Sequence, residues 1–139
     1  MKWILVLLAV LGIVASSLAL REHYNTGVAP CDINERWDCG IVNHSPFALF
    51  YGVPVAIIGI AGYLLLGVLA FRRAYPWMLP FVIGAFTFAV HLADIERYAL
   101  GVWCIYCVIS LGIITLMTLL VVATVIARST MISVFREER

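Results

Sequence analysis

The sequence predicts an all-α integral membrane protein, a four-transmembrane-helix bundle that forms a single domain over residues 1–139. Of the 139 residues, 64% are hydrophobic and only 12% are charged, whereas soluble domains carry about 25% charged residues. The apolar residues also gather in four runs, each close to the ~20 residues needed to cross the hydrocarbon core of a bilayer. The net charge of +1 is too small to suggest a nucleic-acid partner, which is typically recognised by a strongly basic surface.

The four apolar runs give the expected helices in order. They cover residues 3–20, 53–71, 76–93 and 102–127. None contains a Lys, Arg, Asp or Glu, as expected because a charge at the bilayer centre is costly. The first run also resembles a secretory signal peptide, but it is longer than the ~7–15 apolar residues of a typical signal. We therefore expect it to stay in the membrane as a helix.

The charges in the connecting segments predict the orientation. Short loops rich in Lys and Arg stay in the cytoplasm, and the 72–75 loop contains two arginines and no acidic residue. The 21–52 segment carries two basic and four acidic residues, and the 94–101 segment carries one basic and two acidic residues. We therefore expect both termini in the cytoplasm and these two segments on the outer face. The membrane would be the inner membrane of a bacterium, or the endoplasmic reticulum membrane of a eukaryote.

The four cysteines form two closely spaced pairs, Cys31/Cys39 and Cys104/Cys107. The expected topology places both pairs at the outer face, where disulfides form and persist. Cys104 and Cys107 lie where the fourth helix begins, and their three-residue offset puts both sulfurs on one helical face. With Cys104 in the first turn, the helix N-terminus favours its thiolate, the form that attacks disulfides. The polar 32–38 stretch lacks helical periodicity, so we expect a mobile loop.

Three interpretations of these cysteines are open at this point. They could exchange disulfides in a redox reaction, or form static disulfides that pin the outer loops of a structural four-span protein. They could also form a Cys₄ zinc site, because Cys-x₂-Cys spacing is typical of zinc. The seven-residue spacing of the first pair is loose for zinc, and the second pair lies partly in the membrane. We therefore predict no metal site.

A longer pattern links the cysteines to other residues. It contains Cys31-x₇-Cys39, Ser45 six residues later, Gly52-x-Pro54, and Cys104-Ile105-Tyr106-Cys107 at the start of the last helix. This combination resembles the vitamin K epoxide reductase family, and the resemblance runs from about residue 3 to residue 127. In the disulfide-bond formation protein B family, which does similar chemistry, the Cys-x-x-Cys motif comes in the first outer loop. In this chain it comes last.

The resemblance implies a four-helix bundle around a quinone of the ubiquinone, menaquinone or vitamin K type, with a short half-helix as a cap on the outer side. The sequence around Ser45 supports such a cap. Ser45 is a favourable N-cap, and Pro46 suits the first helical position. The run from 47 to 51 is apolar, and Gly52 and Pro54 should end the helix.

The resemblance also implies a path for electrons. A reduced thioredoxin-like protein on the outer side gives electrons to Cys31, and Cys39 then attacks Cys104. This frees Cys107 as the thiolate that faces the quinone, and the quinone is reduced. The chain would thus be a quinone-dependent thiol/disulfide oxidoreductase that generates disulfides. Because the chain ends soon after the fourth helix, we expect the thioredoxin-like partner to be a separate protein.

The resemblance leaves a second activity open. Animal members reduce vitamin K epoxide, and they carry a tyrosine four residues after the second motif cysteine, where this chain has Leu111. Reduction of the epoxide, or of the vitamin K quinone, is therefore the alternative within the family.

Two further residues are candidates for contact with the quinone. Ser45 is the first, although it could act only as a helix cap. His91 is the one ionisable residue well inside a predicted span, and such residues mark functional sites by default. Its depth matches that of Cys107, so it could hydrogen-bond a quinone oxygen or supply a proton, or simply bond a neighbouring helix. We expect Glu96 and its charged neighbours to form a solvated loop end.

Overall fold

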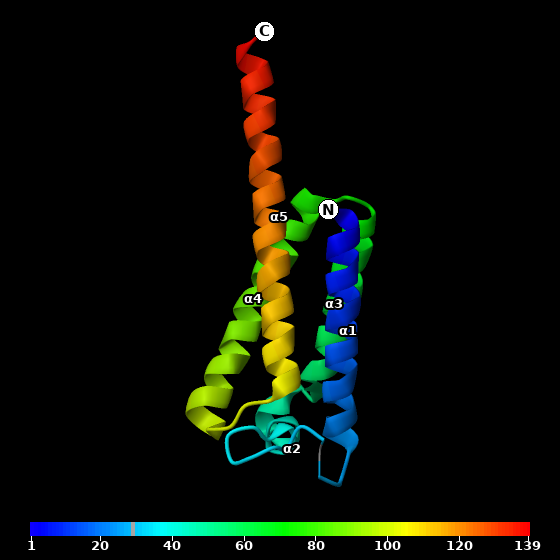
Figure 1. Ribbon diagram of the computed structural model, residues 1–139, viewed down its shortest axis with the longest axis vertical. Coiled ribbons are helices and arrows are strands. Elements are labelled where there is room, and N and C mark those ends of the chain that lie inside the picture. Colours follow the sequence, from blue (N-terminus) through cyan, green and yellow to red (C-terminus); the bar gives the residue numbers. More distant parts are fainter. Residues whose placement is uncertain (29) are drawn as a thin grey trace.

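The computed structural model describes residues 1–28 and 30–139. Its helices are α1 (Lys2–Tyr24), α2 (Cys39–His44), α3 (Val55–Phe71), α4 (Tyr75–Ile95) and α5 (Ile105–Glu137). The four long helices run beside one another, and the short α2 lies across one end of them (Figure 1). Helix α1 packs mainly against α3, and α4 packs mainly against α5, while α1 and α5 also meet.

Within the described residues, three helices are long and apolar enough to cross a membrane. They are α1, α4 with its continuation to Leu100, and α5. Helix α3 is also apolar but has only 17 residues. The prediction of a helical membrane protein is therefore confirmed, and the count of four spans stays a prediction.

Large apolar side chains form a core between the long helices. The fully buried ones include Leu5, Leu66, Met78, Val82, Met117 and Val121. Small residues let α1 and α3 approach closely, because Gly59 of α3 lies against Ser16 and Gly67 lies against Ala9. Such close contacts between small residues are a common means of packing helices in membranes. This apolar core holds the four long helices in place relative to one another.

Three helices extend beyond their predicted ends. Helix α1 continues to Tyr24, and α5 continues to Glu137, ten residues past the apolar run. Helix α4 leads directly into a π-helix over Glu96–Leu100, where we had expected a loop. The π-helix ends at Gly101, which has the left-handed conformation (φ 69°). The apolar runs marked the parts that suit lipid, but a helix can continue into a polar segment where its backbone hydrogen bonds persist.

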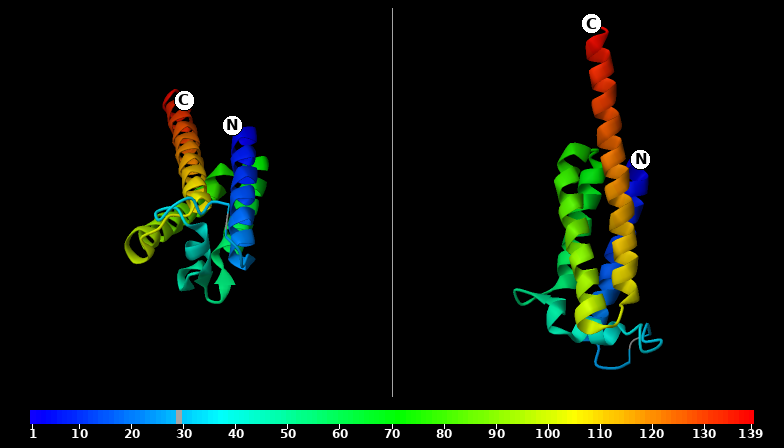
Figure 2. Two further views of the ribbon diagram at one scale, coloured as in Figure 1. Left: turned by 60° about the horizontal axis from the view of Figure 1, so that its bottom comes forward. Right: turned by 90° about the vertical axis from the view of Figure 1, so that its left-hand side faces the viewer.

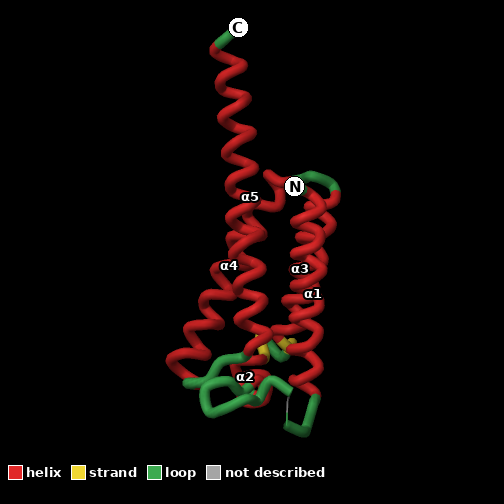
Figure 3. Tube along the Cα trace, in the orientation of Figure 1, coloured by secondary structure: helices red, strands yellow, loops and turns green. Residues whose placement is uncertain are grey.

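The expected half-helix after Ser45 is wrong. Pro46–Ala48 forms only one turn of 3₁₀ helix. The next residues form a small antiparallel hairpin of β1 (Leu49–Phe50) and β2 (Val53–Pro54), so the fold is not purely α-helical (Figure 3). The physical reason lies at Gly52, whose positive φ of 81° closes the hairpin turn, a conformation that glycine adopts at little cost.

The short helix at this end is instead α2, which begins before Ser45. Its N-cap is Asp38, whose side chain accepts a hydrogen bond of 2.9 Å from the N–H of Ile41. Ser45 ends α2, and its hydroxyl donates to the carbonyl of Val42 rather than capping a helix that follows. The polar residues before Cys39 are therefore a cap and a turn for α2.

The two ends of the bundle carry different residues. The N-terminus and the turn between α3 and α4, with Arg72 and Arg73, lie at one end (Figure 1). The hairpin, α2 and the segment before α5 gather at the other end, as two further views show (Figure 2). The arginine-rich turn and the cysteine-bearing segments are therefore separated by the length of the bundle.

Candidate functional site

The first cysteine pair is a disulfide on a short, hydrogen-bonded loop. Cys31 and Cys39 are bonded, with Cα atoms 5.9 Å apart, and both side chains are buried. The carboxylate of Asp32 accepts a hydrogen bond from the N–H of Gly40 at 3.1 Å. The side-chain oxygen of Asn34 accepts hydrogen bonds from the N–H groups of Arg36 and Trp37, at 2.9 and 3.2 Å. The loop thus has a defined shape, while its mobility stays a prediction.

The loop of the first pair is joined to the segment of the second pair. The N–H of Asp38 donates to the carbonyl of Trp103 at 3.0 Å, and the N–H of Trp103 donates to the carbonyl of Arg36 at 2.7 Å. These bonds form a bridge between Trp37 and Trp103. Trp103 directly precedes Cys104, so the bridge holds the two cysteine pairs together at one end of the bundle.

The second pair consists of two free thiols at the start of α5. Cys104 is the N-cap rather than part of the first turn, and Cys107 lies within that turn. A hydrogen bond from the Cys107 thiol lowers the pKa of Cys104, and N–H groups at the start of α5 add to this effect. Burial and the charge of Glu96 oppose it. Cys104 is therefore the favoured thiolate of this pair.

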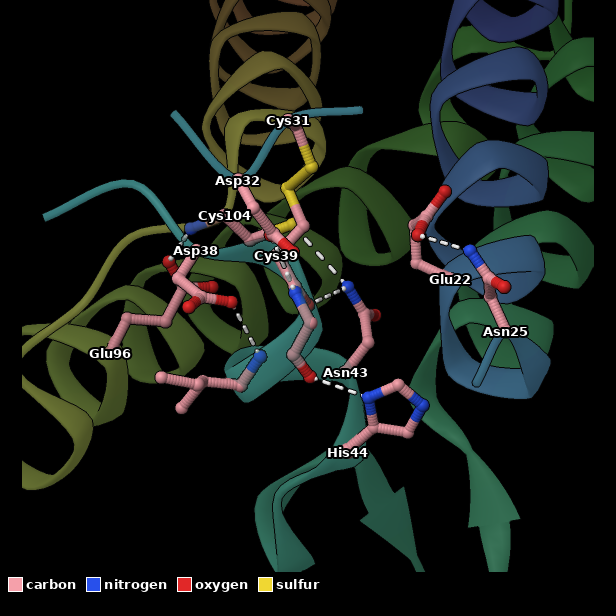
Figure 4. The surroundings of a disulfide bond; sticks show 12 residues. Glu22, Asn25, Cys31, Asp32, Asp38, Cys39, Asn43, His44, Glu96 and Cys104 are labelled. Atoms are coloured by element: carbon pink, nitrogen blue, oxygen red, sulfur yellow. Dashed lines mark hydrogen bonds between the residues drawn. A yellow bond between two sulfur atoms is a disulfide. The ribbon is translucent and has the colours of Figure 1, made fainter. Parts of the chain in front are cut away.

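Asn43 connects the two pairs, and it is a site residue that the sequence analysis missed. Its side-chain amide donates to the carbonyl of Cys39 at 2.9 Å and to the sulfur of Cys104 at 3.6 Å (Figure 4). The backbone carbonyl of Asn43 accepts a hydrogen bond of 2.6 Å from Nδ1 of His23 on α1. Asn43 lies four residues after Cys39, one turn along α2, so recognising Asp38 as the N-cap could have identified it.

Glu96 is a second residue that sequence reasoning missed. It is only 3% exposed, so the expectation of a solvated loop end is wrong here. Its carboxylate accepts a hydrogen bond of 3.1 Å from the N–H of Cys104 and also faces the Cys107 thiol. The π-helix after α4 carries Glu96 to this position. No spacing in the sequence relates this residue to the cysteine motif.

A cavity of about 350 Å³ lies between the long helices, next to the second cysteine pair. Most of its wall is apolar, and the polar or ionisable groups on it include His23, Asn43, Ser45, Tyr63, Glu96 and Cys107. Ligand pockets of about 300–1,000 Å³ with apolar walls and few polar groups are typical of small-molecule sites. Cys107 lies in the wall and Cys104 does not, so only the second thiol of the motif faces this space.

The structure brings Ser45 to this cavity but not His91. Ser45 is on the wall, and so is Leu111. His91 is exposed on the outside of α4, whereas its neighbours Ala89 and Leu92 line the cavity. Matching depth in two helices does not fix the rotation of either, because each residue turns a helix by about 100°. The expectation that His91 contacts a ligand beside Cys107 therefore has no support from its position.

Comparison with known proteins agrees with this architecture. The model of the Vitamin K epoxide reductase family matches residues 3–124 of the chain. A search of curated proteins finds no match. The matched region covers most of the chain and includes both cysteine pairs, α2 and the wall of the cavity. The chain belongs to the vitamin K epoxide reductase family, whose members are oxidoreductases integral to membranes.

Proposed function

We propose that this protein is a membrane thiol/disulfide oxidoreductase that passes electrons from a thioredoxin-like protein to a quinone. The observation that carries this proposal is the position of Cys107, a free thiol in the wall of an apolar cavity. Its partner Cys104 does not line the cavity but lies in one buried cluster with Cys31 and Cys39. The second pair is thus a link between the disulfide of the loop and the cavity.

Transfer between the pairs proceeds by disulfide exchange, which passes through a mixed disulfide. Cys39 and Cys104 are both fully buried in the same cluster and share Asn43 as a hydrogen-bond partner. With Cys31 and Cys39 bonded and the second pair reduced, this arrangement corresponds to the state after electrons have moved inward. This geometry supports Cys39 as the residue that attacks Cys104.

The cavity suits a quinone ring of the ubiquinone, menaquinone or vitamin K type. Its walls come from all four long helices and are mainly apolar, and the side chains of Ser45, Tyr63 and Leu111 would contact the bound ring. The quinone, when bound, supplies a group that accepts two electrons. The protein contributes the Cys107 thiol and a space that excludes water. Leu111 offers no hydroxyl to an epoxide, which favours quinone reduction over reduction of vitamin K epoxide.

The proposal includes a topology. Helix α3 has 17 residues, about the lower limit for a transmembrane helix, and it lies beside α1 along the bundle, so we count it as the fourth span. Both termini and the arginine-rich turn are then cytoplasmic. The cysteines face the periplasm of a bacterium, or the lumen of the endoplasmic reticulum, and the thioredoxin-like partner is a separate protein on that side.

The test is quinone reduction by purified protein with a reduced thioredoxin-like donor, followed by absorbance. We expect one quinone to be reduced for each donor dithiol oxidised, and we expect Cys107→Ser to abolish this reaction while leaving the thermal midpoint of unfolding near its original value. A structural four-span protein with static disulfides would reduce no quinone. A protein that reduces vitamin K epoxide in the same assay, but not the quinone, would support the alternative activity.

A further inference from the structure

The relay between the cysteine pairs creates a thiolate inside the protein, and a proton held beside it would stabilise it. When Cys39 attacks Cys104, the bond between Cys104 and Cys107 breaks and leaves its electron pair on the Cys107 sulfur. That sulfur lies in the wall of an apolar cavity, where a thiolate is poorly solvated. Exchange is faster when the leaving sulfur is stabilised. A proton donor beside Cys107 would therefore assist the step.

Glu96 occupies this position. Its side chain is buried, and its Oε2 accepts a hydrogen bond from the N–H of Cys104 at 3.1 Å. Glu96 and Cys107 also lie together in the wall of the cavity. This bond and the shared cavity wall place one carboxyl group beside both members of the pair. A buried carboxyl group is costly unless it is hydrogen-bonded, and among the described residues the hydrogen bond to the Glu96 carboxyl group comes from the redox pair itself.

Two charged groups near Glu96 are engaged elsewhere, and a third, Asp94, is exposed to the surroundings. Arg97, the next residue, lies over the ring of Tyr98 at 5.2 Å. On the loop side, Asp38 is joined through its backbone to Trp103, and its carboxylate caps α2. Among the titratable groups in the part of the chain that the structure describes, the two thiols of the second pair are those that face Glu96.

We propose that Glu96 is a catalytic general acid for Cys107, an inference that rests on the relay proposed above. As the Cys39 sulfur bonds to Cys104, the Cys107 sulfur leaves and takes the proton of the Glu96 carboxyl group. The products are a Cys39–Cys104 disulfide, a Cys107 thiol and a Glu96 carboxylate. Cys31 thiolate then attacks Cys39, and Cys104 leaves as a thiolate. Two electrons have moved from the first pair to the second, and the Glu96 proton now resides on Cys107.

The structure matches the products of these two exchange steps. Cys31 is bonded to Cys39, Cys104 and Cys107 are free thiols, and the carboxyl group of Glu96 is hydrogen-bonded to the N–H of Cys104 beside them. When the second pair is reoxidised, the same carboxylate can take the proton back from Cys107. Glu96 would thus serve both directions of proton transfer at one sulfur.

The test measures transfer between the pairs without any quinone. Fully oxidised protein is mixed with saturating dithiothreitol, quenched with acid at intervals, alkylated, and mapped by mass spectrometry to follow the appearance of free Cys107. The rate should rise with pH as the first pair ionises and fall again as Glu96 loses its proton. Glu96→Gln keeps an oxygen for the N–H of Cys104 but cannot donate as an acid. We expect it to slow transfer about 10²-fold at the wild-type optimum and to remove the fall at high pH.

Three variants complete the test. Asp94→Asn removes an exposed acid two residues away and should keep the wild-type rate and profile, while Glu96→Asp should keep the bell-shaped profile at a reduced rate. A Glu96→Gln protein with the wild-type profile, whether fast or uniformly slow, would overturn the role as an acid. Cys39→Ser tests the relay itself: if free Cys107 then appears as fast as in the wild type, the proposed function fails, whatever Glu96 does.

Discussion

The two cysteine pairs lie at the same end of the molecule but are held in place by different kinds of contact. The loop of the first pair is organised by near neighbours in the sequence, through the bonds from Asp32 to Gly40 and from Asp38 to Ile41. The second pair is surrounded by residues that are remote from it or lie on other elements, such as Asn43 of α2 and Glu96 beyond α4. Apart from its bridge to Trp103, the first environment is therefore local, and the second depends on the whole fold.

This difference explains which parts of the site the sequence could predict. The residues Cys31, Cys39, Cys104 and Cys107 were found from their spacing, because each pair is a local pattern. The environment of Cys104 was not found, since it depends on a buried acid eight residues earlier and an amide 61 residues earlier. Charges at the end of an apolar run look like a solvated loop until the fold is known.

The largest effect should come from the remote contacts. Asn43→Asp replaces the amide that donates to the Cys104 sulfur with an acceptor that carries negative charge, which raises the pKa of Cys104. Hydrogen bonds to charged groups contribute about 1.5–3 kcal/mol, so we expect alkylation of Cys104 in the reduced protein at neutral pH to slow about 10- to 100-fold. Site-resolved mass spectrometry after timed alkylation measures this rate.

The matched control is Asn34→Asp, which adds the same charge to the loop of the first pair. The oxygen of Asn34 acts only as an acceptor for backbone N–H groups, and a carboxylate can replace it. Alkylation of Cys104 should therefore stay near the wild-type rate. Equal slowing in both variants would show that charge alone, and not the contact at Cys104, determines the reactivity of that thiol.

A smaller effect should come from the local contacts. Asp38→Ala removes the N-cap of α2, and such losses cost about 1 kcal/mol. We expect a lower thermal midpoint of unfolding in detergent, with the reactivity of Cys104 little changed. Asp38→Ser keeps an oxygen for the N–H of Ile41 and should recover most of the loss. If Ser and Ala lower the midpoint equally, Asp38 does not stabilise α2 as a cap.

The smallest effect should come from His91. The sequence placed it at the depth of Cys107, but in the structure it is exposed on the far side of α4 from the cavity. His91→Ala should leave the Michaelis constant for quinone and the turnover rate near their wild-type values. A marked rise in the Michaelis constant would return His91 to the quinone site and contradict the rotation of α4 described above.

The fold shows the same division between local and remote information. The long helices were predictable because an apolar run is a local signal that lipid requires. The hairpin over Leu49–Pro54 was not, since Ser45 and Pro46 form a typical helix start that the turn at Gly52 overrides. The π-helix over Glu96–Leu100 was missed for a related reason. It brings Glu96 to the N–H of Cys104, and this contact is known only once the packing against α5 is known.

The most direct test of the relay is to trap the mixed disulfide between the pairs. In Cys107→Ser protein, the Cys104 thiol can attack the Cys31–Cys39 disulfide, but no partner on α5 can resolve the product. Non-reducing peptide mapping of this variant should find Cys39 linked to Cys104, with Cys31 free. An intact Cys31–Cys39 bond beside a free Cys104, even after incubation with a reduced donor, would contradict the passage of electrons from the loop to the helix.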